Sequence, residues 1–569
     1  MEHFAQIVMA ALNEVLEKNF QVNECTSFHE LQLPQDPQWG DFSFACFSLA
    51  KSVKTPPSEI ASTIFKLLQE KALPDITVTQ IGAYLNFTLS HEALCHQLLP
   101  SLLCNPKDTQ ATRGTWILEF SSPNIAKPLN IYHLRTTALG AALYRIGKAR
   151  GYRMIAINHL GDWGKQYGML ALAFKKYQKN PSDMKMQELV ELYVKINQDA
   201  KQDPELESQA REAFLHLEQG NPEMVSLWKT CVAISLESFQ KQYQDLNVIF
   251  DHTRGESYYL KDIPAILKLL REQNLLVPSE GAWVVHVENQ EGQPLPPCLL
   301  QKGDGATLYA TRDLAAALQR YEEFSFDRMT YIVGSEQRLH FQQLFSLLKK
   351  MQLPWASRCE HLPTGLYRFE DTKMSTRQGN FVTLEEVIKI TEQKVIDLIQ
   401  ERKHAAPQGA LSSLQEVSHA IALGAIIFHD LHTDPARNVD FHLEKIVDFE
   451  GQTGPHLQYA HTRCLSVLRK AKVPTQKINH LSEKEELLLL RKLGQFPFYL
   501  EQCLKLTKVS PLSHYLMEIV RLWNQFYKNC KILHEDPQIA HSRLLLVEAT
   551  RQVLAEGLGY LGIPLPEWM

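Results

Sequence analysis

The sequence predicts an α/β fold built on a doubly wound parallel sheet in the middle of the chain, with an α+β unit before it and an all-α unit after it. A short apolar run at 116–120 leads through a polar loop into residues with helical spacing, and a second short run follows at 154–157. Strand, helix and strand in this order are typical of parallel sheets that bind ligands at the carboxyl ends of their strands. Beyond residue 383 the pattern is almost entirely helical.

Length and composition indicate a globular protein of several domains. The chain has 569 residues, which is too long for one core and suggests about three or four domains of roughly 100–200 residues each. Its 44% hydrophobic and 22% charged residues are ordinary for a soluble protein. No apolar run approaches the roughly 20 residues that span a bilayer, and the amino-terminal helix carries acidic residues, unlike a signal peptide.

Cysteine spacing and net charge indicate further which kind of protein this is. The ten cysteines form no C-x-x-C pair and no His-Cys cluster, which favours reduced thiols over zinc or disulfides and predicts a cytoplasmic protein without a bound metal. The net charge of −5 argues against indiscriminate coating of nucleic acid. Local basic patches can still bind a large RNA.

Residues 1–110 are expected to form the α+β unit. Its opening helix carries apolar residues on one face, namely Phe4, Ile7, Val8, Ala11, Leu12, Val15 and Leu16. A second helix is expected after Pro56-Pro57, and one strand is expected over 81–89.

The central unit starts with a strand, a loop and a helix start. Trp116-Ile117-Leu118 is brief and β-prone, and Leu134, Leu139, Leu143 and Ile146 return at helical spacing. Backbone N–H groups at a helix N-terminus have no intrahelical partners and carry the positive end of the macrodipole, so a triphosphate can bind there. The loop also holds five side chains that can bind a cation or an anion, namely Glu119, Asn124, Lys127, Asn130 and His133.

The rest of the central unit is expected to complete the sheet. The loop 158–164 follows the second strand, and its Gly161 permits close backbone approach, while Asp162 can either order a neighbouring helix or bind a substrate amine. Residues 169–289 have a mostly helical, charged pattern and are expected to be an insertion. The sheet is expected to return near 298–300, followed by a strand that enters a helix at 307–313 and a buried strand at 329–334.

Several strings resemble arginyl-tRNA synthetases of the bacterial type, which are class I aminoacyl-tRNA synthetases with a Rossmann-like catalytic domain. EFSSPNIAKPL, with His133-Leu134-Arg135 after it, resembles the HIGH-motif region of that family, and NHLGDWGKQYG resembles its second active-site loop. Thr372 to Asn380 resembles the KMSKS loop. The string from Gly451 to Arg463 and the terminal GIPLPEWM resemble the helical anticodon-binding domain. The first unit resembles the family's amino-terminal domain, which implies contact with the tRNA corner.

The resemblance implies a two-step reaction. The carboxylate of L-arginine attacks the α-phosphorus of ATP and releases pyrophosphate, and the terminal ribose hydroxyl of tRNA then captures the arginyl-adenylate and releases AMP. ATP is the implied nucleotide substrate, with Mg²⁺ held largely by phosphate and water. Arginine, ATP and arginine tRNA are the implied partners, no membrane is involved, and we expect a monomer.

The resemblance also implies roles for individual residues. Catalysis is implied for Lys127, Asn130, His133, Lys373 and Ser375. Nucleotide binding is implied for Pro123, Asn130, Tyr132, His133, Gly161, Asp162, Lys373 and Met374. Arginine binding is implied for Glu119, Asn124, Glu256, Tyr309, Asp313 and Gln337. The carboxylates of Glu119 and Asp313 suit a guanidinium, which favours paired acceptors. For Glu256, a position in a solvated turn is an equally good interpretation. Contact with tRNA is implied for Tyr459, Arg463 and Arg469, whereas Trp523 is expected in the core.

The sequence departs from the family at a sensitive place and leaves two alternatives open. The family usually has His-x-Gly-His where this chain has Asn130-Ile131-Tyr132-His133. Asn130 can donate a hydrogen bond but cannot become cationic, and the Tyr132 ring has to turn aside to admit adenine. One alternative is therefore a catalytically weakened tRNA-binding paralogue. The other is an adenylyltransferase of the same fold acting on a small acid, which should survive deletion of the residues after about 450.

We expect the following domain boundaries. The amino-terminal domain covers 1–110, and the catalytic domain covers 111–385 with its helical insertion at about 169–289. A helical connector covers 386–445, and the anticodon-binding domain covers 446–569.

Overall fold

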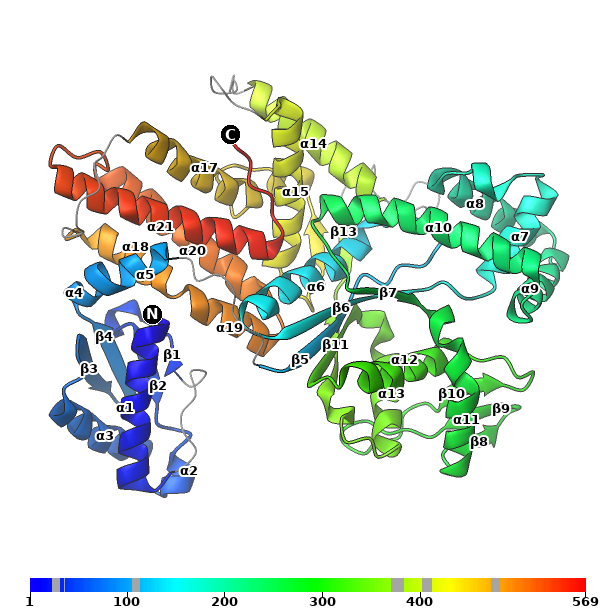
Figure 1. The fold of residues 1–569 in the computed structure, drawn as a ribbon, viewed down its shortest axis with the longest axis horizontal. Helices are drawn as coiled ribbons and strands as arrows, with labels where there is room; N and C mark the ends of the chain where they lie inside the picture. Colours follow the sequence, from blue (N-terminus) through cyan, green and yellow to red (C-terminus); the bar gives the residue numbers. More distant parts are fainter. Residues whose placement is uncertain (23–30, 35, 105–112, 370–382, 402–411, 472–480) are drawn as a thin grey trace.

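The computed structural model describes the chain from Met1 to Met569 apart from residues 23–30, 35, 105–112, 370–382, 402–411 and 472–480 (Figure 1). Its centre is a five-stranded parallel sheet with the strand order β12-β11-β5-β6-β7. The strands are β5 (Thr115–Glu119), β6 (Arg153–Leu160), β7 (His252–Gly255), β11 (Arg328–Gly334) and β12 (Cys359–Thr364). The doubly wound parallel sheet predicted from the sequence is confirmed.

The order of the strands places a ligand crevice at β5. The chain adds β6 and β7 on one side of β5 and then crosses to add β11 and β12 on the other side. In open α/β sheets, ligands bind outside the carboxyl ends of the strands where the order reverses. The residues that follow β5 and β11 therefore lie at the expected place for a substrate site.

Helices cover both faces of this sheet. Successive residues of β5 point to opposite sides, so Trp116 and Leu118 join one hydrophobic core and Ile117 joins the other. The helices of the central unit are α6 (Ile131–Ala149), α7 (Gln166–Lys176), α8 (Met186–Gln202), α9 (Glu205–Glu218), α10 (Pro222–Asp245), α11 (Ile263–Glu272), α12 (Tyr309–Phe324) and α13 (Arg338–Lys350), of which α8 and α9 pack on α7 and α10 rather than on the sheet.

The predicted insertion and the return of the sheet need correction. β7 belongs to the central sheet although it lies inside 169–289, and it escaped detection because an edge strand of sequence HTRG has no apolar run. β8 (Val277–Ser279), β9 (Ala282–Val285) and β10 (Cys298–Lys302) form a separate antiparallel sheet, so 298–300 is not the return of the central sheet. The chain re-enters that sheet at β11, and the strand expected before α12 is reduced to one bridge between Gln301 and Thr307.

The amino-terminal unit is an antiparallel sheet packed against helices. Its elements are α1 (Glu2–Phe20), β1 (Leu31–Gln32), β2 (Phe42–Ala45), α2 (Ala50–Val53), α3 (Pro57–Lys71), β3 (Ile76–Ile81) and β4 (Tyr84–Leu89), followed by α4 (His91–Ala93) and α5 (Leu99–Leu103). The strand expected over 81–89 is β4, but it begins at Tyr84, because Gly82 adopts a left-handed φ of 58° and turns the chain between β3, which ends at Ile81, and β4.

The carboxy-terminal half is mostly helical, as predicted. Its elements are β13 (Tyr367–Phe369), α14 (Leu384–Glu401), α15 (Leu414–His432), β14 (Val439–Phe441), α16 (Leu443–Ile446), α17 (Gly454–Lys470), α18 (Lys484–Gly494), α19 (Phe496–Leu506), α20 (Ser510–Asn529) and α21 (Pro537–Leu561). Trp523 is fully buried, which confirms its predicted place in the core.

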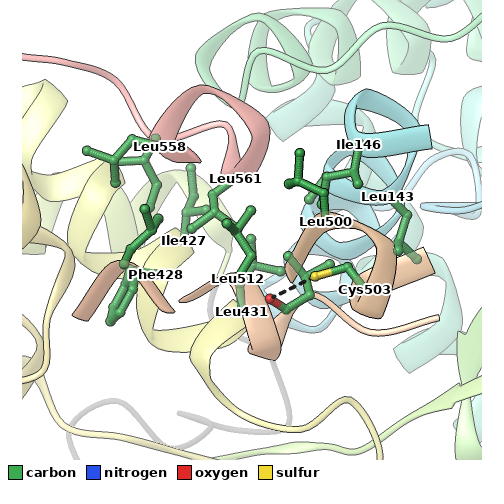
Figure 2. Packing of buried hydrophobic residues seen from close by; sticks show 14 of the residues in the cluster. Leu143, Ile146, Ile427, Phe428, Leu431, Leu500, Cys503, Leu512, Leu558 and Leu561 are labelled. Carbon is green, nitrogen blue, oxygen red and sulfur yellow. Dashed lines mark hydrogen bonds between the residues drawn. The ribbon is translucent and has the colours of Figure 1, made fainter. Parts of the chain in front are cut away.

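The helical half packs directly on α6. Figure 2 shows Leu143 and Ile146 of α6 beside Leu500 and Cys503 of α19, within a cluster to which α15, α20 and α21 also contribute. The helix that begins at the predicted nucleotide site is thus covered by the helical half of the chain.

The amino-terminal unit is attached to the same helices. The buried carboxylate of Asp41 accepts a hydrogen bond from the Leu89 backbone N–H at 2.8 Å and another from the Arg491 guanidinium of α18. The Glu2 carboxylate lies 2.6 Å from the Arg150 guanidinium, next to the end of α6. Asp41 therefore holds two units of the chain together.

Candidate active site

The loop after β5 has an unusual backbone. Ser121, Ser122 and Ala126 have φ values of 70°, 48° and 60°, in the left-handed region that residues other than glycine rarely adopt. Asn124, between them, bridges to Gly161 of the second loop, where an added Cβ would lie 2.1 Å from the Asn124 Oδ1. Such strained conformations concentrate at functional sites, where the surrounding structure holds them.

Asn130 caps the helix that the loop leads into. Its Oδ1 accepts hydrogen bonds from the backbone N–H groups of Tyr132 and His133 at 3.1 and 3.3 Å. In return, the His133 Nδ1 accepts one from the Asn130 N–H at 3.1 Å. Asparagine is among the residues most favoured at a helix N-cap. Capping α6 is therefore a structural role for Asn130, which stands where arginyl-tRNA synthetases usually have histidine.

The same contacts fix the state of His133. Because its Nδ1 accepts a hydrogen bond, the neutral ring carries its proton on Nε2. Burial lowers the pKa of His133 to about 4, and the nearby charge of Lys127 acts in the same direction. At neutral pH, His133 is therefore an uncharged hydrogen-bond donor through Nε2.

Tyr132 and Arg135 connect this helix start to the helical half. The Tyr132 ring packs edge-on against Tyr367 of β13, with ring centroids 6.2 Å apart, and the Tyr367 hydroxyl donates to Asp430 of α15. The buried Arg135 guanidinium lies 3.7 Å from that carboxylate. It also donates to three backbone carbonyls, those of Asp434, Pro435 and Arg437, at 2.9, 2.9 and 2.8 Å.

Described residues on either side of 370–382 in sequence lie beside this helix start. Tyr367 lies just before the segment and contacts Tyr132. Thr383 lies just after it and forms an antiparallel bridge with Asn130, while the Leu384 N–H donates to the Leu129 carbonyl at 3.0 Å. Lys373, Met374 and Ser375 belong to that segment and lie outside the described residues.

The carboxylates predicted to bind arginine form a buried charge network. Glu119 lies 2.5 Å from the guanidinium of Arg320 of α12, which is fully buried and also donates to the His159 Nδ1 at 3.3 Å. Asp313 faces the Nε2 atoms of His159 and His340 at 3.2 and 2.7 Å. Burial opposes ionisation of Asp313, but the two histidines outweigh it and hold the pKa of Asp313 well below its usual range.

This network contains residues that the sequence analysis missed. Arg320 lies seven residues after Asp313, on the same face of α12. Its partner Glu119 is about 200 residues away in sequence, so no local sequence pattern predicts the Glu119–Arg320 pair. His159 was visible only as part of the second loop. The structure gives Glu119 an internal partner, and its contact with a substrate guanidinium stays a prediction.

The remaining arginine candidates lie at the rim of the network. Tyr309 is 50% exposed, and its ring lies 4.8 Å from that of His340. Gln337 is exposed directly after β11. Glu256 forms a close ion pair with Arg312, and burial raises the pKa of Glu256 while Arg312 opposes that rise. Glu256 is thus part of a salt bridge rather than a solvated turn.

Asp162 orders the start of a neighbouring 3₁₀ helix, Glu256–Asp262, and ordering a helix was one of its two predicted roles. Its carboxylate accepts hydrogen bonds from the Ser257 N–H at 2.9 Å and from the Ser257 hydroxyl at 2.5 Å. Burial raises the pKa of Asp162, and the hydrogen bonds from Ser257 oppose that rise. Pro123 is buried at the loop, whereas Lys127 is exposed on it.

The predicted tRNA residues lie on one helix far from this site. The Arg463 guanidinium stacks over the Tyr527 ring at 4.1 Å and lies 5.6 Å from the Tyr459 ring. Tyr459 lines an apolar pocket of about 110 Å³ together with Phe449 and Met569. The half-exposed Arg469 lies 3.9 Å from Glu567.

The described residues hold neither a metal-binding cluster nor a membrane-spanning helix. No group of three or more His, Cys, Asp or Glu side chains within the described ranges is arranged to hold a metal ion. None of the helices in those ranges combines the length and the apolar character that a membrane span requires.

Comparison with known proteins identifies three family models along the chain. Residues 98–443 match the model of tRNA synthetases class I (R), catalytic domain. Residues 2–89 match the arginyl tRNA synthetase N terminal domain, and residues 457–569 match the DALR anticodon binding domain.

Curated relatives match almost the whole chain. The arginine–tRNA ligase of Exiguobacterium sp. is 37% identical over 568 residues, with 98% of both chains covered. Arginine–tRNA ligase 2 of Bacillus anthracis is 38% identical, with 97% of this chain and 98% of the relative covered. Among solved structures, the arginyl-tRNA synthetase of Thermus thermophilus has the same fold, with a TM-score of 0.83 and 23% identity over 99% of this chain and 100% of the other.

Proposed function

The chain belongs to the arginyl-tRNA synthetase family, and from this premise we propose that it attaches L-arginine to its cognate tRNA through an arginyl-adenylate formed from ATP. The observation that carries the proposal is the anchoring of two segments at one helix start. Asn130 contacts both His133 and Thr383, so the first motif lies beside the described residue that follows the Lys373 segment in sequence, which supports the proposal.

At the ATP end, we assign the phosphates to the N-terminus of α6. The Nε2–H of His133, the Asn130 amide and Lys127 donate to phosphate oxygens, together with Lys373, whose segment Ser375 supports. Charge develops on these oxygens as the α-phosphorus is attacked, so fixed donors stabilise the transition state more than the bound substrate. Pro123, Tyr132, Gly161, Asp162 and Met374 border the nucleotide in this proposal.

In this proposal, Mg²⁺ binds to the protein only together with the nucleotide. The described residues offer no cluster of carboxylates for it. We therefore expect Mg²⁺ to arrive bound to the triphosphate and to keep phosphate and water as its ligands.

At the arginine end, we assign the guanidinium to Asp313. Its low pKa keeps it anionic throughout the physiological range, and its carboxylate lies between His159 of β6 and His340 of α13. Tyr309 supplies a stacking face, and Gln337, Asn124, Glu119 and Glu256 supply further polar contacts. A planar guanidinium favours paired acceptors held in fixed positions, which this network provides.

We propose that tRNA contacts both ends of the chain. The anticodon-binding domain (446–569) presents Tyr459, Arg463 and Arg469, where an arginine between two tyrosine rings suits unpaired bases and phosphates. The amino-terminal domain (1–110) contacts the tRNA corner, the catalytic domain covers 111–385, and the connector covers 386–445. Since one chain carries every part, we propose a monomer in the cytoplasm.

Two observations weaken the alternatives. The Asn130 amide oxygen caps α6 and the Tyr132 ring packs toward Tyr367, so neither departure from the family requires an inactive paralogue. The helical half packs on α6, which an adenylyltransferase without an RNA domain does not need.

The test is arginine-dependent exchange of pyrophosphate into ATP with cognate tRNA present. We expect exchange that requires arginine, followed by charging of the tRNA. Folded protein that binds tRNA but catalyses no exchange would contradict the proposal.

A further inference from the structure

One helix of the insertion runs along both active-site loops. α10 extends from the cluster of α7, α8 and α9 back to the central sheet (Figure 1). Trp228, Ser235 and Tyr243 are spaced by seven and eight residues, so they lie on one stripe of the helix. Each of the three side chains makes a hydrogen bond to one of the two loops or to the strand before the second loop.

Tyr243 holds the start of the strained loop. Its buried hydroxyl lies 2.8 Å from the Ser121 Oγ and accepts a hydrogen bond from the Asn158 Nδ2 at 3.1 Å. Ser121 is in turn 2.9 Å from the Thr137 hydroxyl, which donates to the His133 carbonyl at 2.6 Å.

These hydroxyls are connected one to the next. The Thr137 hydroxyl has two acceptors within hydrogen-bond distance, the His133 carbonyl and the Ser121 Oγ. The Tyr243 hydroxyl hydrogen-bonds with the Ser121 Oγ and accepts from Asn158. A continuous row of hydrogen bonds thus joins the strand before the second loop, α10, the first loop and His133 itself.

Ser235 and Trp228 hold two further points. The Ser235 Oγ accepts a hydrogen bond from the Ala126 N–H at 3.0 Å and donates to the Cys231 carbonyl at 2.8 Å. The Trp228 Nε1–H donates to the Asp162 carbonyl at 2.8 Å. Ser121 and Ala126, which both adopt left-handed φ, are therefore fixed by the same helix on either side of Asn124.

We propose that α10 is a brace for the active site and that Tyr243 and Ser235 are positioning residues for Asn124 and His133. This inference rests on the proposed function, because those two residues are the groups assigned there to arginine and ATP. A strained loop keeps its shape only where its surroundings enforce it. The helix α10 thus has a task in catalysis although none of its side chains is assigned to a substrate.

The test compares full-length variants in pyrophosphate exchange with cognate tRNA. We expect Tyr243→Phe and Ser235→Ala each to lower kcat by about 10- to 100-fold, the range expected when reacting groups are misplaced by a fraction of an ångström to about 1 Å. The KM for tRNA should stay within about twofold. Ser235→Thr, which keeps the hydroxyl, should recover most of the loss.

A matched control separates positioning from general damage. Tyr515 is equally buried and donates its hydroxyl to backbone carbonyls of α18, far from the loops. Tyr515→Phe should lower the thermal midpoint as much as Tyr243→Phe does but leave kcat unchanged. If Tyr243→Phe and Ser235→Ala keep kcat within twofold of the wild type, or change it no more than Tyr515→Phe does, the brace is wrong.

Amide hydrogen exchange distinguishes failure of the brace from failure of the proposed function. In Ser235→Ala, the Ala126 N–H loses its acceptor and should exchange faster, whether or not the enzyme is active. If the wild type is inactive but the Ala126 N–H exchanges faster in Ser235→Ala, the proposed function is wrong and the proposed role of α10 is supported. If amide exchange at 121–126 is unchanged in both Tyr243→Phe and Ser235→Ala, the proposed role of α10 is wrong.

Discussion

At the scale of single residues, the site depends on groups held in one protonation state. His133 stays neutral at neutral pH because burial lowers its pKa to about 4, and the charge of Lys127 acts in the same direction. Asp313 stays charged because two histidines face its carboxylate. A neutral donor for phosphate and a permanent anion for a guanidinium are therefore available together without pH-dependent switching.

Removing the His133 imidazole should affect the chemical step more than binding. Single donors to developing charge are worth about 100- to 1,000-fold in kcat. We expect His133→Ala to lower kcat of pyrophosphate exchange by about that factor, with a smaller change in the KM for ATP. His133→Gln, which keeps an N–H donor, should lose less. Equal kcat for wild type and His133→Ala would remove His133 from the mechanism.

The low pKa of His133 also predicts how its contribution to stability changes with pH. An unfolded histidine titrates near about 6.5, and the folded one near about 4, so between these values the unfolded chain binds more protons. The contribution is therefore complete above about pH 6.5 and falls as the pH drops toward 4. Thermal midpoints at pH 7.5 and 5.5 check this, since the wild type should lose more on acidification than His133→Gln. An equal loss in both proteins would contradict the assigned state.

Tyr132 offers a test of the departure from the family. Its ring packs against Tyr367, so we expect Tyr132→Gly to lower the thermal midpoint and not to raise kcat/KM for ATP, whereas Tyr132→Phe should resemble the wild type. A glycine in the first turn of a helix also costs about 1 kcal/mol in helix propensity. A gain in kcat/KM for ATP in Tyr132→Gly would show instead that the phenol obstructs the nucleotide.

At the scale of elements, α6 is joined to the helical half by Arg135 and Asp430. Burial raises the pKa of Asp430 while Arg135 opposes that rise, and the Arg135 guanidinium also satisfies the carbonyls of the turn before β14. This anchor lies two residues after His133 and contacts Tyr367, the strand residue that precedes the Lys373 segment.

Breaking this anchor should be costly. Removal of one partner of a buried ion pair typically costs about 3–5 kcal/mol, because the other charge stays buried without compensation. We therefore expect Asp430→Ala to lower the thermal midpoint strongly and to lower kcat of exchange as well. Glu14→Ala, which removes an exposed ion pair of the amino-terminal unit, serves as the control and should change neither. A normal midpoint and kcat in Asp430→Ala would exclude an anchoring role.

The elements that the sequence predicted are those with a strong local signal. β5, β6 and β11 are short apolar runs, and α6 has apolar residues at helical spacing. β7 is a polar edge strand and has no such signal. The turn at Gly82 interrupts one continuous β-prone run, so the sequence pattern does not locate it. The Asn130 cap was detectable, since Asn followed three residues later by His133 begins an amphipathic pattern. The pairing of Glu119 with Arg320 was not, because contact between distant segments leaves no periodicity.

At the scale of the whole molecule, the three units share one packed framework. Leu143 and Ile146 of α6 contact the core of the helical half (Figure 2). Asp41 and Arg491 join the amino-terminal unit to that half. Deleting the residues after about 450 would therefore uncover α6 and disturb the catalytic unit itself. Such a deletion does not discriminate between a synthetase and an adenylyltransferase, whereas point variants can.

The most direct measurement is a crystal structure of the full chain with arginine and a non-hydrolysable ATP analogue. The account predicts that the His133 Nε2 and the Lys373 Nζ both lie within about 2.7–3.2 Å of triphosphate oxygens, with the guanidinium against Asp313. A triphosphate that contacts only one of these two segments, or a Tyr132 ring in the place of the adenine, would contradict it.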